Sequence, residues 1–123
     1  MFEIESTEYG IDVDLSGSID RAEVEEFYEE LEAEAARQPD GFSIRADHRD
    51  LNTLPEGADE MFADLMTMCK DNGLGRSVVV FDSAVNKMQH ERLKDEAGLD
   101  DQIIVDASSN DDWRTEVRDW VTN

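Results

Sequence analysis

Apolar and polar residues alternate at the start of the chain and predict two short β-strands. The alternation runs over residues 2–6 and again over residues 11–16, where aspartates separate Ile11, Val13 and Leu15. A period of two is typical of strands with one buried face. A Tyr-Gly pair between the two segments predicts a turn, so we expect an antiparallel hairpin.

Beyond the hairpin, apolar residues recur every three or four positions in four segments, which predicts four helices. The first helix is expected over residues 21–37. Short apolar runs between the helices predict three further strands. These strands cover residues 42–46, 77–81 and 103–105, and the later helices follow Thr53, Ser83 and Asn110.

The resulting order is ββαβαβαβα, in a single domain over residues 1–123. Strands that alternate with helices are joined by right-handed crossovers and form a parallel sheet flanked by helices. The predicted fold class is therefore α/β, with a mostly parallel sheet and an N-terminal antiparallel hairpin. Because residues 78–81 are apolar without interruption, we expect their strand to be central and covered on both faces.

Polar residues mark the expected helix ends. Asp20 with Glu23, and Thr53 with Glu56, have the capping-box spacing at two helix starts. The other expected signals are helix ends at Asn72-Gly73 and Gly98, a cap at residues 108–110 and a polar loop over residues 47–52.

The helical periodicity assigns several side chains to the core or the surface. Cys69 lies on an apolar stripe and is expected to be buried. Met61 and Met68 are candidates for a partner-facing patch. Trp113 and Trp120 either anchor the last helix to the sheet or leave one ring exposed for a partner. The other side chains expected to face inward are Met66, Val85, Met88, Leu93 and Ala97.

The segment from Asp12 to Glu23 also has the spacing of an EF-hand calcium loop. An EF-hand needs a helix before its loop, but the preceding residues alternate with a period of two. A strand, a glycine and a capped helix form the favoured interpretation, and a calcium-binding module is the alternative. Its ligands would be Asp12, Asp14, Ser16, Asp20 and Glu23.

Composition adds a strong negative charge. The 123 residues include 32 acidic and 11 basic side chains, which gives a net charge of −21. Such a chain repels phosphates, so nucleic acids and anionic membrane surfaces are not expected partners. An acidic excess with few lysines indicates a salt-rich cytoplasm, where a Debye length of about 3 Å screens the repulsion. We therefore expect the protein to lose stability in dilute buffer.

From the sequence we expect neither a membrane anchor nor an export signal. The first residues lack a basic stretch followed by an apolar one, and the run over residues 78–81 is far too short to span a bilayer. We expect a cytoplasmic protein without membrane insertion that is a monomer or weak dimer.

Four motifs are distributed along nearly the whole length of the chain. They are residues 13–20 entering the first helix, residues 43–57 entering the second, residues 78–83, and residues 105–108 before a tryptophan-rich helix. In this order and spacing they resemble the STAS domain family, whose best-known members are bacterial anti-sigma-factor antagonists. The SpoIIAA-like branch is more similar still. The resemblance implies the same α/β fold and a regulatory, protein-binding role.

The resemblance also concerns a phosphorylation site. In antagonists of this family, a kinase partner phosphorylates a serine at the start of the second helix, and the added charge switches partner binding. The matching positions here are Pro55 and Glu56, so that serine is absent. Thr53 could replace it or only cap the helix, and Glu56 could act as a fixed anion or only as the box partner. The capping roles are favoured.

Catalytic motifs are weak. Ser83 follows the central strand but lacks the glycines of a nucleophile elbow. His48 is expected in a surface loop, with a role in a ligand crevice as the alternative. His90 is expected to be solvated, and its distance from His48 along the chain gives no zinc motif. We expect no enzyme activity, no cofactor and no metal.

The sequence thus predicts a non-enzymatic regulatory or protein-interaction module of STAS/SpoIIAA-like type. Its working surface is expected where strands end and helices begin, facing a protein partner or a small anionic ligand. A small-ligand or lipid-binding domain, by analogy with Sec14-type relatives, is a further alternative that needs a pocket of roughly hundreds of Å³. The expected partner-interaction residues are Asp50, Asn52, Thr53, Glu56, Gly57, Asp82, Ser83 and Asn86.

Overall fold

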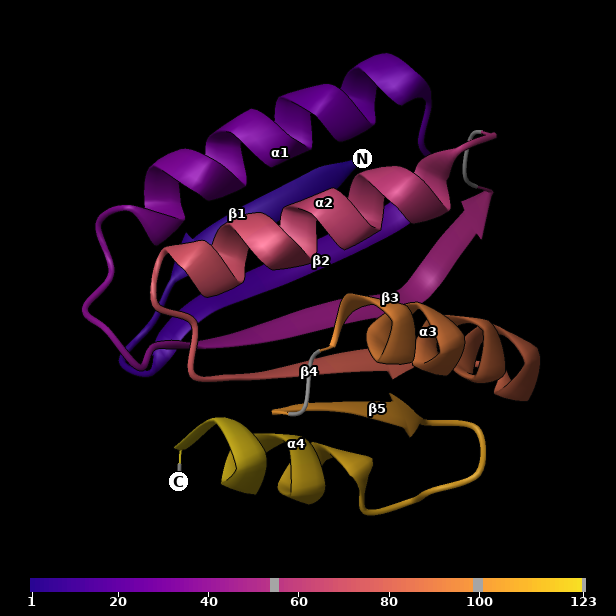
Figure 1. Ribbon diagram of the computed structural model, residues 1–123. Helices are drawn as coiled ribbons and strands as arrows, with labels where there is room; N and C mark the ends of the chain where they lie inside the picture. The colour runs from indigo at the N-terminus through magenta and orange to yellow at the C-terminus, as the bar shows by residue number, and fades with distance from the viewer. Residues whose placement is uncertain (54–55, 99–100, 123) are drawn as a thin grey trace.

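Five strands form one sheet within residues 1–53, 56–98 and 101–122, the part of the chain that the computed structural model describes (Figure 1). In order across the sheet they are β1 (Phe2–Ser6), β2 (Gly10–Ser18), β3 (Ser43–Thr53), β4 (Arg76–Phe81) and β5 (Gln102–Asp106). β1 pairs with β2 in antiparallel orientation, and the other pairs are parallel. The predicted hairpin and mostly parallel sheet are confirmed.

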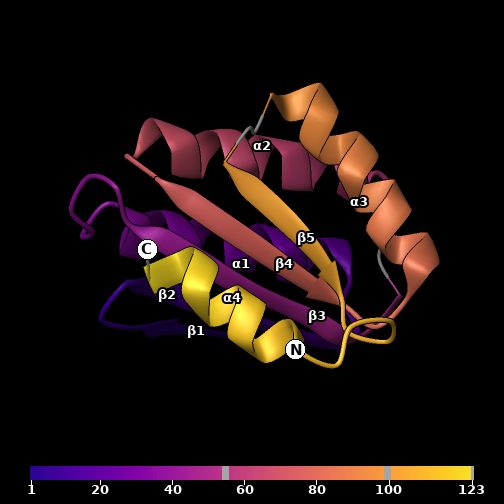
Figure 2. The same ribbon diagram turned by 90° about the horizontal axis from the view of Figure 1, so that it is seen from below.

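Helices cover both faces of the sheet. One face carries α1 (Arg21–Ala35), α2 (Ala58–Asp71) and α3 (Ala84–Ala97), and the other carries α4 (Trp113–Thr122) (Figure 2). The strands follow one another across the sheet, so right-handed crossovers place the three connecting helices on the same face. The element order and the α/β fold class are as predicted.

The alternating residues of β2 build the main core. Val13 and Leu15 are buried under α1 and α2, whereas Asp12 and Asp14 point to the opposite face. Apolar residues on one side of each helix complete this core. From α1 these are Val24, Phe27, Leu31 and Ala35, and from α2 they are Phe62, Leu65, Met66, Met68 and Cys69.

β4 is covered on both faces, as its uninterrupted apolar sequence predicts. Val78 and Val80 pack against α4, while Val79 and Phe81 face the side of α2 and α3. Trp113 is buried in the α4 layer, and Trp120 Nε1 donates a hydrogen bond of 2.8 Å to the backbone oxygen of Ser77. The anchoring role predicted for the two tryptophans is therefore confirmed.

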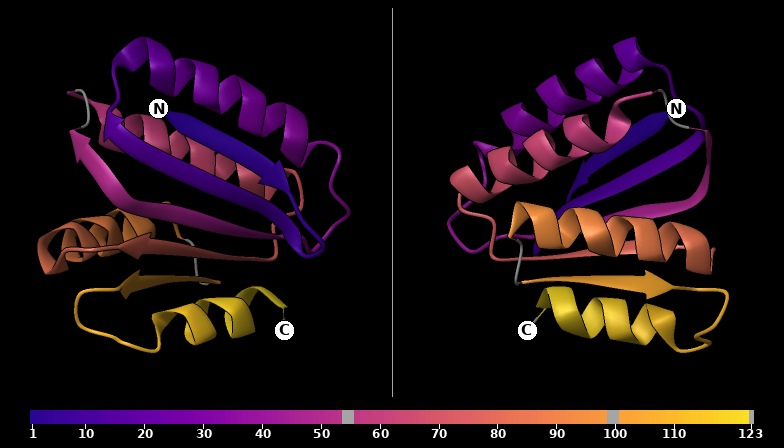
Figure 3. Two further views of the ribbon diagram at one scale, coloured as in Figure 1. Left: turned by 180° about the vertical axis from the view of Figure 1, so that it is seen from behind. Right: turned by 45° about the vertical axis from the view of Figure 1, so that its right-hand side comes forward.

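The side of the sheet that carries α4 is only partly covered. α4 contacts β3, β4 and β5, and no described helix lies over the back of β1 and β2 (Figure 3, left). Two rows of charged residues cross this open region from strand to strand. They are Glu5–Asp12–Arg45 and Glu3–Asp14–Asp47.

The predicted cap of α1 is confirmed. Asp20 precedes α1, and its Oδ1 accepts a hydrogen bond of 2.8 Å from the backbone N–H of Glu23. Gly98 is the C-cap of α3 in the left-handed conformation, with φ of 68°, and Asn72 is the C-cap of α2, which ends at Asp71; both caps are as expected.

The predicted cap of the last helix is only partly correct. Ser108 and Ser109 hydrogen-bond to Asp106 and turn the chain at the end of β5. Asn110 does bond toward the helix, because its Oδ1 accepts from the backbone N–H of Asp112 at 3.0 Å. The two serines therefore stabilise the turn after β5, and only Asn110 interacts with the residues that lead into α4.

The predicted polar loop over residues 47–52 is wrong, because β3 continues through it to Thr53. Its pairing with β2 extends as far as Ser18 beside Thr53, with two register shifts along the way. Polar residues are tolerated in this strand because they pair locally. Asp47, for example, binds the guanidinium of Arg49 at 2.8 Å.

The predicted start of the second helix is also wrong. α2 begins at Ala58, and its N-cap is Gly57, with φ of 82° and no side-chain capping bond. Thr53 cannot form a capping box with Glu56, because it is the last residue of β3. Pro55 lies outside the described residues.

The predicted orientation of several side chains on their helices is wrong. Val85 and Met88 of α3, expected to face inward, are 62% and 66% exposed, whereas His90 is buried. α3 has few apolar residues, so their spacing predicts the wrong side of this helix to face the core. Met68, expected on a partner-facing patch, is buried, and Met61 is half-buried. Met66 is buried as predicted, and the side chains of residues 93 and 97 lie outside the description.

Candidate functional site

The candidate site lies at the edge of the sheet where β3 and β4 end and α2 and α3 begin (Figure 1). Parallel strands place their carboxyl ends at one edge, so the helices that follow also start there. The N-terminal N–H groups of these helices favour negatively charged ligands or side chains. We name this region the helix-start edge, and it comprises the eight partner-interaction residues predicted above.

The first part of the helix-start edge surrounds the start of α2. Asp50, Glu56 and Gly57 are exposed there, and Thr53 ends the neighbouring strand. A side chain at Gly57 would come within 3.7 Å of Arg21 Nη1, so the first turn of α1 lies beside the start of α2. No local sequence pattern predicts Arg21 here, because its position depends on how the two helices pack.

The second part of the helix-start edge surrounds the start of α3. Ser83 is the N-cap, and its hydroxyl accepts a hydrogen bond of 3.4 Å from the backbone N–H of Asn86. Asp82 and Asn86 are exposed, and Ser83 is half-buried. Of the predicted residues, the side chains of Asn52 and Thr53 lie outside the description.

Two histidines meet behind this edge, beneath the helices. The His48 ring from β3 lies 5.2 Å from Phe81, 6.0 Å from Phe62 and 6.2 Å from His90, measured between ring centroids. Burial, followed by the neighbouring His90, lowers the pKa of His48 to about 3. Neither histidine is at the surface, so both solvent-exposed assignments are wrong. The extension of β3 carries His48 onto the helix-covered face.

An ion pair within β3 contacts α4 on the other face of the sheet. Arg49 donates to Asp47 from its side chain and its backbone N–H, and its guanidinium carbon lies 4.5 Å from the centre of the Trp113 ring. Burial raises the pKa of Asp47, but the hydrogen bonds and charge of Arg49 outweigh it, so the net pKa falls below the usual value. The ion pair and the contact with Trp113 together hold this part of β3 against α4.

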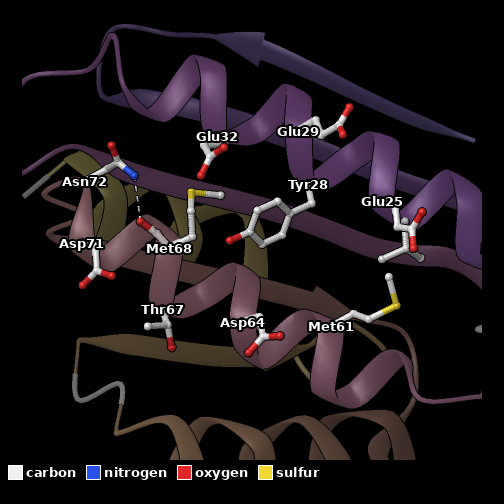
Figure 4. A pocket seen from close by; sticks show the side chains of 11 residues that line it. Glu25, Tyr28, Glu29, Glu32, Met61, Asp64, Thr67, Met68, Asp71 and Asn72 are labelled. Atoms are coloured by element: carbon white, nitrogen blue, oxygen red, sulfur yellow. Dashed lines mark hydrogen bonds between the residues drawn. The ribbon is translucent and has the colours of Figure 1, made fainter.

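A groove runs between α1 and α2 on the outer surface (Figure 4). Its volume is about 650 Å³. Glutamates of α1 and aspartates of α2 line its two sides, and Tyr28, Met61 and Met68 lie between them. Its sequence signal was weak, because the acidic positions of α1 also occur on faces outside the groove.

The structure does not support the calcium-binding alternative. The segment that would form the loop is strand β2 from Gly10 to Ser18, paired on both sides, followed by α1. Asp12 is held by Arg45 at 3.2 Å, and Asp20 caps α1. Within the described residues, no group of three or more His, Cys, Asp or Glu side chains is arranged to hold a metal ion.

An apolar cavity of about 50 Å³ lies between the sheet, α2 and α3. Its lining includes His48, Phe62 and Cys69. Pockets for small organic ligands measure roughly 300–1,000 Å³, so this cavity is far too small for a lipid. Burial raises the pKa of the Cys69 thiol to about 12, which confirms its expected role as a small apolar core residue.

Comparison with known proteins identifies the fold. No protein-family model and no curated protein matches the sequence. The phosphorylated form of SpoIIAA, a Bacillus cell fate determinant, superimposes with a TM-score of 0.62 and 15% identity over 85% of this chain and 90% of that one. An uncharacterised protein of the DUF3478 family from Shewanella loihica PV-4, with a SpoIIAA-like fold, gives 0.67 and 15% over 98% and 92%. The chain has the SpoIIAA-like fold.

No helix within the described residues combines the length and apolar character needed to cross a membrane.

Proposed function

We propose that this protein is a non-enzymatic regulatory module of STAS/SpoIIAA-like type that binds a protein partner at the helix-start edge. The observation that carries the proposal is the SpoIIAA-like fold, which extends over 85% to 98% of the chain in the two comparisons. In this fold the edge presents exposed polar residues from two helix starts. Asp50, Glu56, Asp82 and Asn86 are its exposed side chains.

The burial of two chemically reactive side chains, His48 and Cys69, supports a non-enzymatic role. His48 is buried, and its lowered pKa keeps it neutral at physiological pH. The thiol of Cys69 is buried and protonated. A general base or nucleophile must reach its substrate, and neither group does.

We further propose that Glu56 supplies a permanent negative charge at the start of α2. The related SpoIIAA was solved in a phosphorylated form. In this chain, exposed Glu56 stands immediately before the N-cap Gly57. A carboxylate there interacts favourably with the helix dipole and carries charge without phosphorylation. Partner binding would then not depend on a kinase.

The net charge of −21 supports a salt-rich cytoplasm as the working environment. At the helix-start edge itself, the partner is expected to make hydrogen bonds and apolar contacts that persist at high salt.

Affinity capture from an extract of the producing cells, in KCl of about 2 M, tests the interaction surface. Asn52→Ala combined with Glu56→Ala is expected to abolish capture of a partner that the unchanged protein retains. The matched control combines Gln89→Ala with Glu30→Ala, which removes the same group types from exposed positions elsewhere. Equal capture by both double variants would show that the helix-start edge is not the binding surface.

A further inference from the structure

The groove between α1 and α2 has a length, lining and charge that indicate which kind of partner it binds. Along α2 it extends from Met61 to Asn72. At 1.5 Å per residue this is about 16 Å, or three helical turns. Both helices run in the same direction beside it (Figure 4), and the groove is open to solvent.

Carboxylates line both sides of this groove. Among the described residues that line it, none is basic. The pKa of Tyr28, which points between the two helices, is raised by burial and then by the charges of nearby carboxylates from both sides. The carboxylates lining the groove are Glu25, Glu29 and Glu32 from α1 and Asp64 and Asp71 from α2.

The floor of the groove is apolar and adaptable. Val24 and Met68 are buried at its base, and Tyr28 and Met61 are half-buried along it. Methionine side chains adjust to different partner shapes, and an aromatic ring adds a surface for cations. The groove therefore combines an apolar floor with negatively charged sides.

We infer that this groove binds a basic amphipathic helix of a protein partner. Such a helix would place its apolar stripe on the methionines and Tyr28, and its Lys or Arg side chains against the carboxylates on both sides. A second copy of the chain, with its own net charge of −21, is a poorer electrostatic match to a groove lined by carboxylates than a basic helix is. The inference rests on the proposed function, because it specifies the chemistry of the protein partner.

A synthetic peptide of about 15 residues provides the probe, with leucines on one helical stripe and lysines along both of its sides. A shuffled peptide of the same composition, which forms no stripe, is the control. Amide-resolved NMR in KCl of about 0.5 M, where the Debye length is roughly 4 Å, locates and quantifies binding of each peptide. Tighter binding of the striped peptide is expected, with shifts along α1 and α2.

Two matched variants separate the groove from general acidity. Glu29→Gln with Asp64→Asn removes one carboxylate from each side of the groove, and we expect about tenfold weaker binding. Glu26→Gln with Glu30→Gln removes the same charge from exposed α1 positions outside the groove and should change affinity less than about twofold. All four of these side chains are exposed and none lies in the core, so we expect both variants to fold.

Equal binding of the two peptides, or an equal loss of affinity in the two double variants, would overturn the inference. Binding would then reflect only non-specific attraction of lysines to the acidic surface. This result is distinguishable from failure of the proposed function. The proposed surface fails when Asn52→Ala with Glu56→Ala leaves partner capture intact, whatever the peptides do. The groove fails on the peptide data even if a partner is captured at the helix-start edge.

Discussion

The imidazole rings of His48 and His90 lie 6.2 Å apart at an interplanar angle of 85°, one from β3 and the other from α3. This contact joins a central strand to the helix that covers it, inside an apolar layer that includes Phe81. Two histidines in such a place make the fold sensitive to acid, because the interior disfavours an imidazolium charge.

We predict that the stability of the protein falls as the pH is lowered from 6.5 toward 3. Unfolded His48 takes up a proton near its ordinary pKa of 6.5, whereas folded His48 resists protonation down to about 3. In this window the unfolded state binds more protons, so each pH unit costs about 1.4 kcal/mol of unfolding free energy. Urea unfolding measured from pH 7 to pH 4 gives the slope. A His48→Phe variant with the same slope would contradict the assignment.

The adjacent strands supply a second prediction. Asp14 lies beside Asp47 in one direction and Glu3 in the other. Burial, only partly offset by Arg45, raises the pKa of Asp14, and the neighbouring carboxylates add to the rise. The charged form is therefore unfavourable in the folded state. We expect Asp14→Asn to stabilise the protein by roughly 0.5 kcal/mol at pH 7.

The pH dependence and a neighbouring variant check this prediction. The gain from Asp14→Asn should disappear below pH 3.8, where Asp14 is protonated in both states. Asp47→Asn should have the opposite sign and destabilise by about 1–3 kcal/mol, because it removes the negative charge and one of the two carboxylate oxygens that accept hydrogen bonds from Arg49. Urea titrations of both variants would settle the signs, and destabilisation by Asp14→Asn would refute the argument.

Gly10 controls the start of the parallel pairing between β2 and β3. Its φ is 148°, and an added Cβ would overlap the backbone oxygen of Ser43. We predict that Gly10→Ala costs more than about 2 kcal/mol of unfolding free energy. Gly98→Ala, with φ of 68° and open space around it, should cost only about 1 kcal/mol. Similar losses in the two variants, measured by thermal unfolding, would contradict the role of the close approach.

Salt is expected to stabilise the protein strongly. The net charge of −21 creates self-repulsion, which shortens in range as the Debye length falls from about 14 Å at 0.05 M to roughly 2 Å at 2 M KCl. We expect a large rise in melting temperature between these concentrations. An unchanged melting temperature would show that the acidic surface is not adapted to salt.

The sequence by itself determined the order of the elements. Alternation in β2, the uninterrupted apolar run of β4 and the Asp20 cap act over a few neighbouring residues, and local patterns report them directly. The same local character explains why the burial of Cys69 and the anchoring by Trp113 could be predicted.

Only the tertiary structure decided the rest. β3 extends through polar residues because Arg49 neutralises Asp47 and β2 pairs alongside, which the strand's own sequence does not show. The burial of His48 and His90 follows from that extension and from the rotation of α3. The acidic groove exists only because α1 and α2 lie side by side. Long-range packing creates these features, and no local pattern in the sequence contains it.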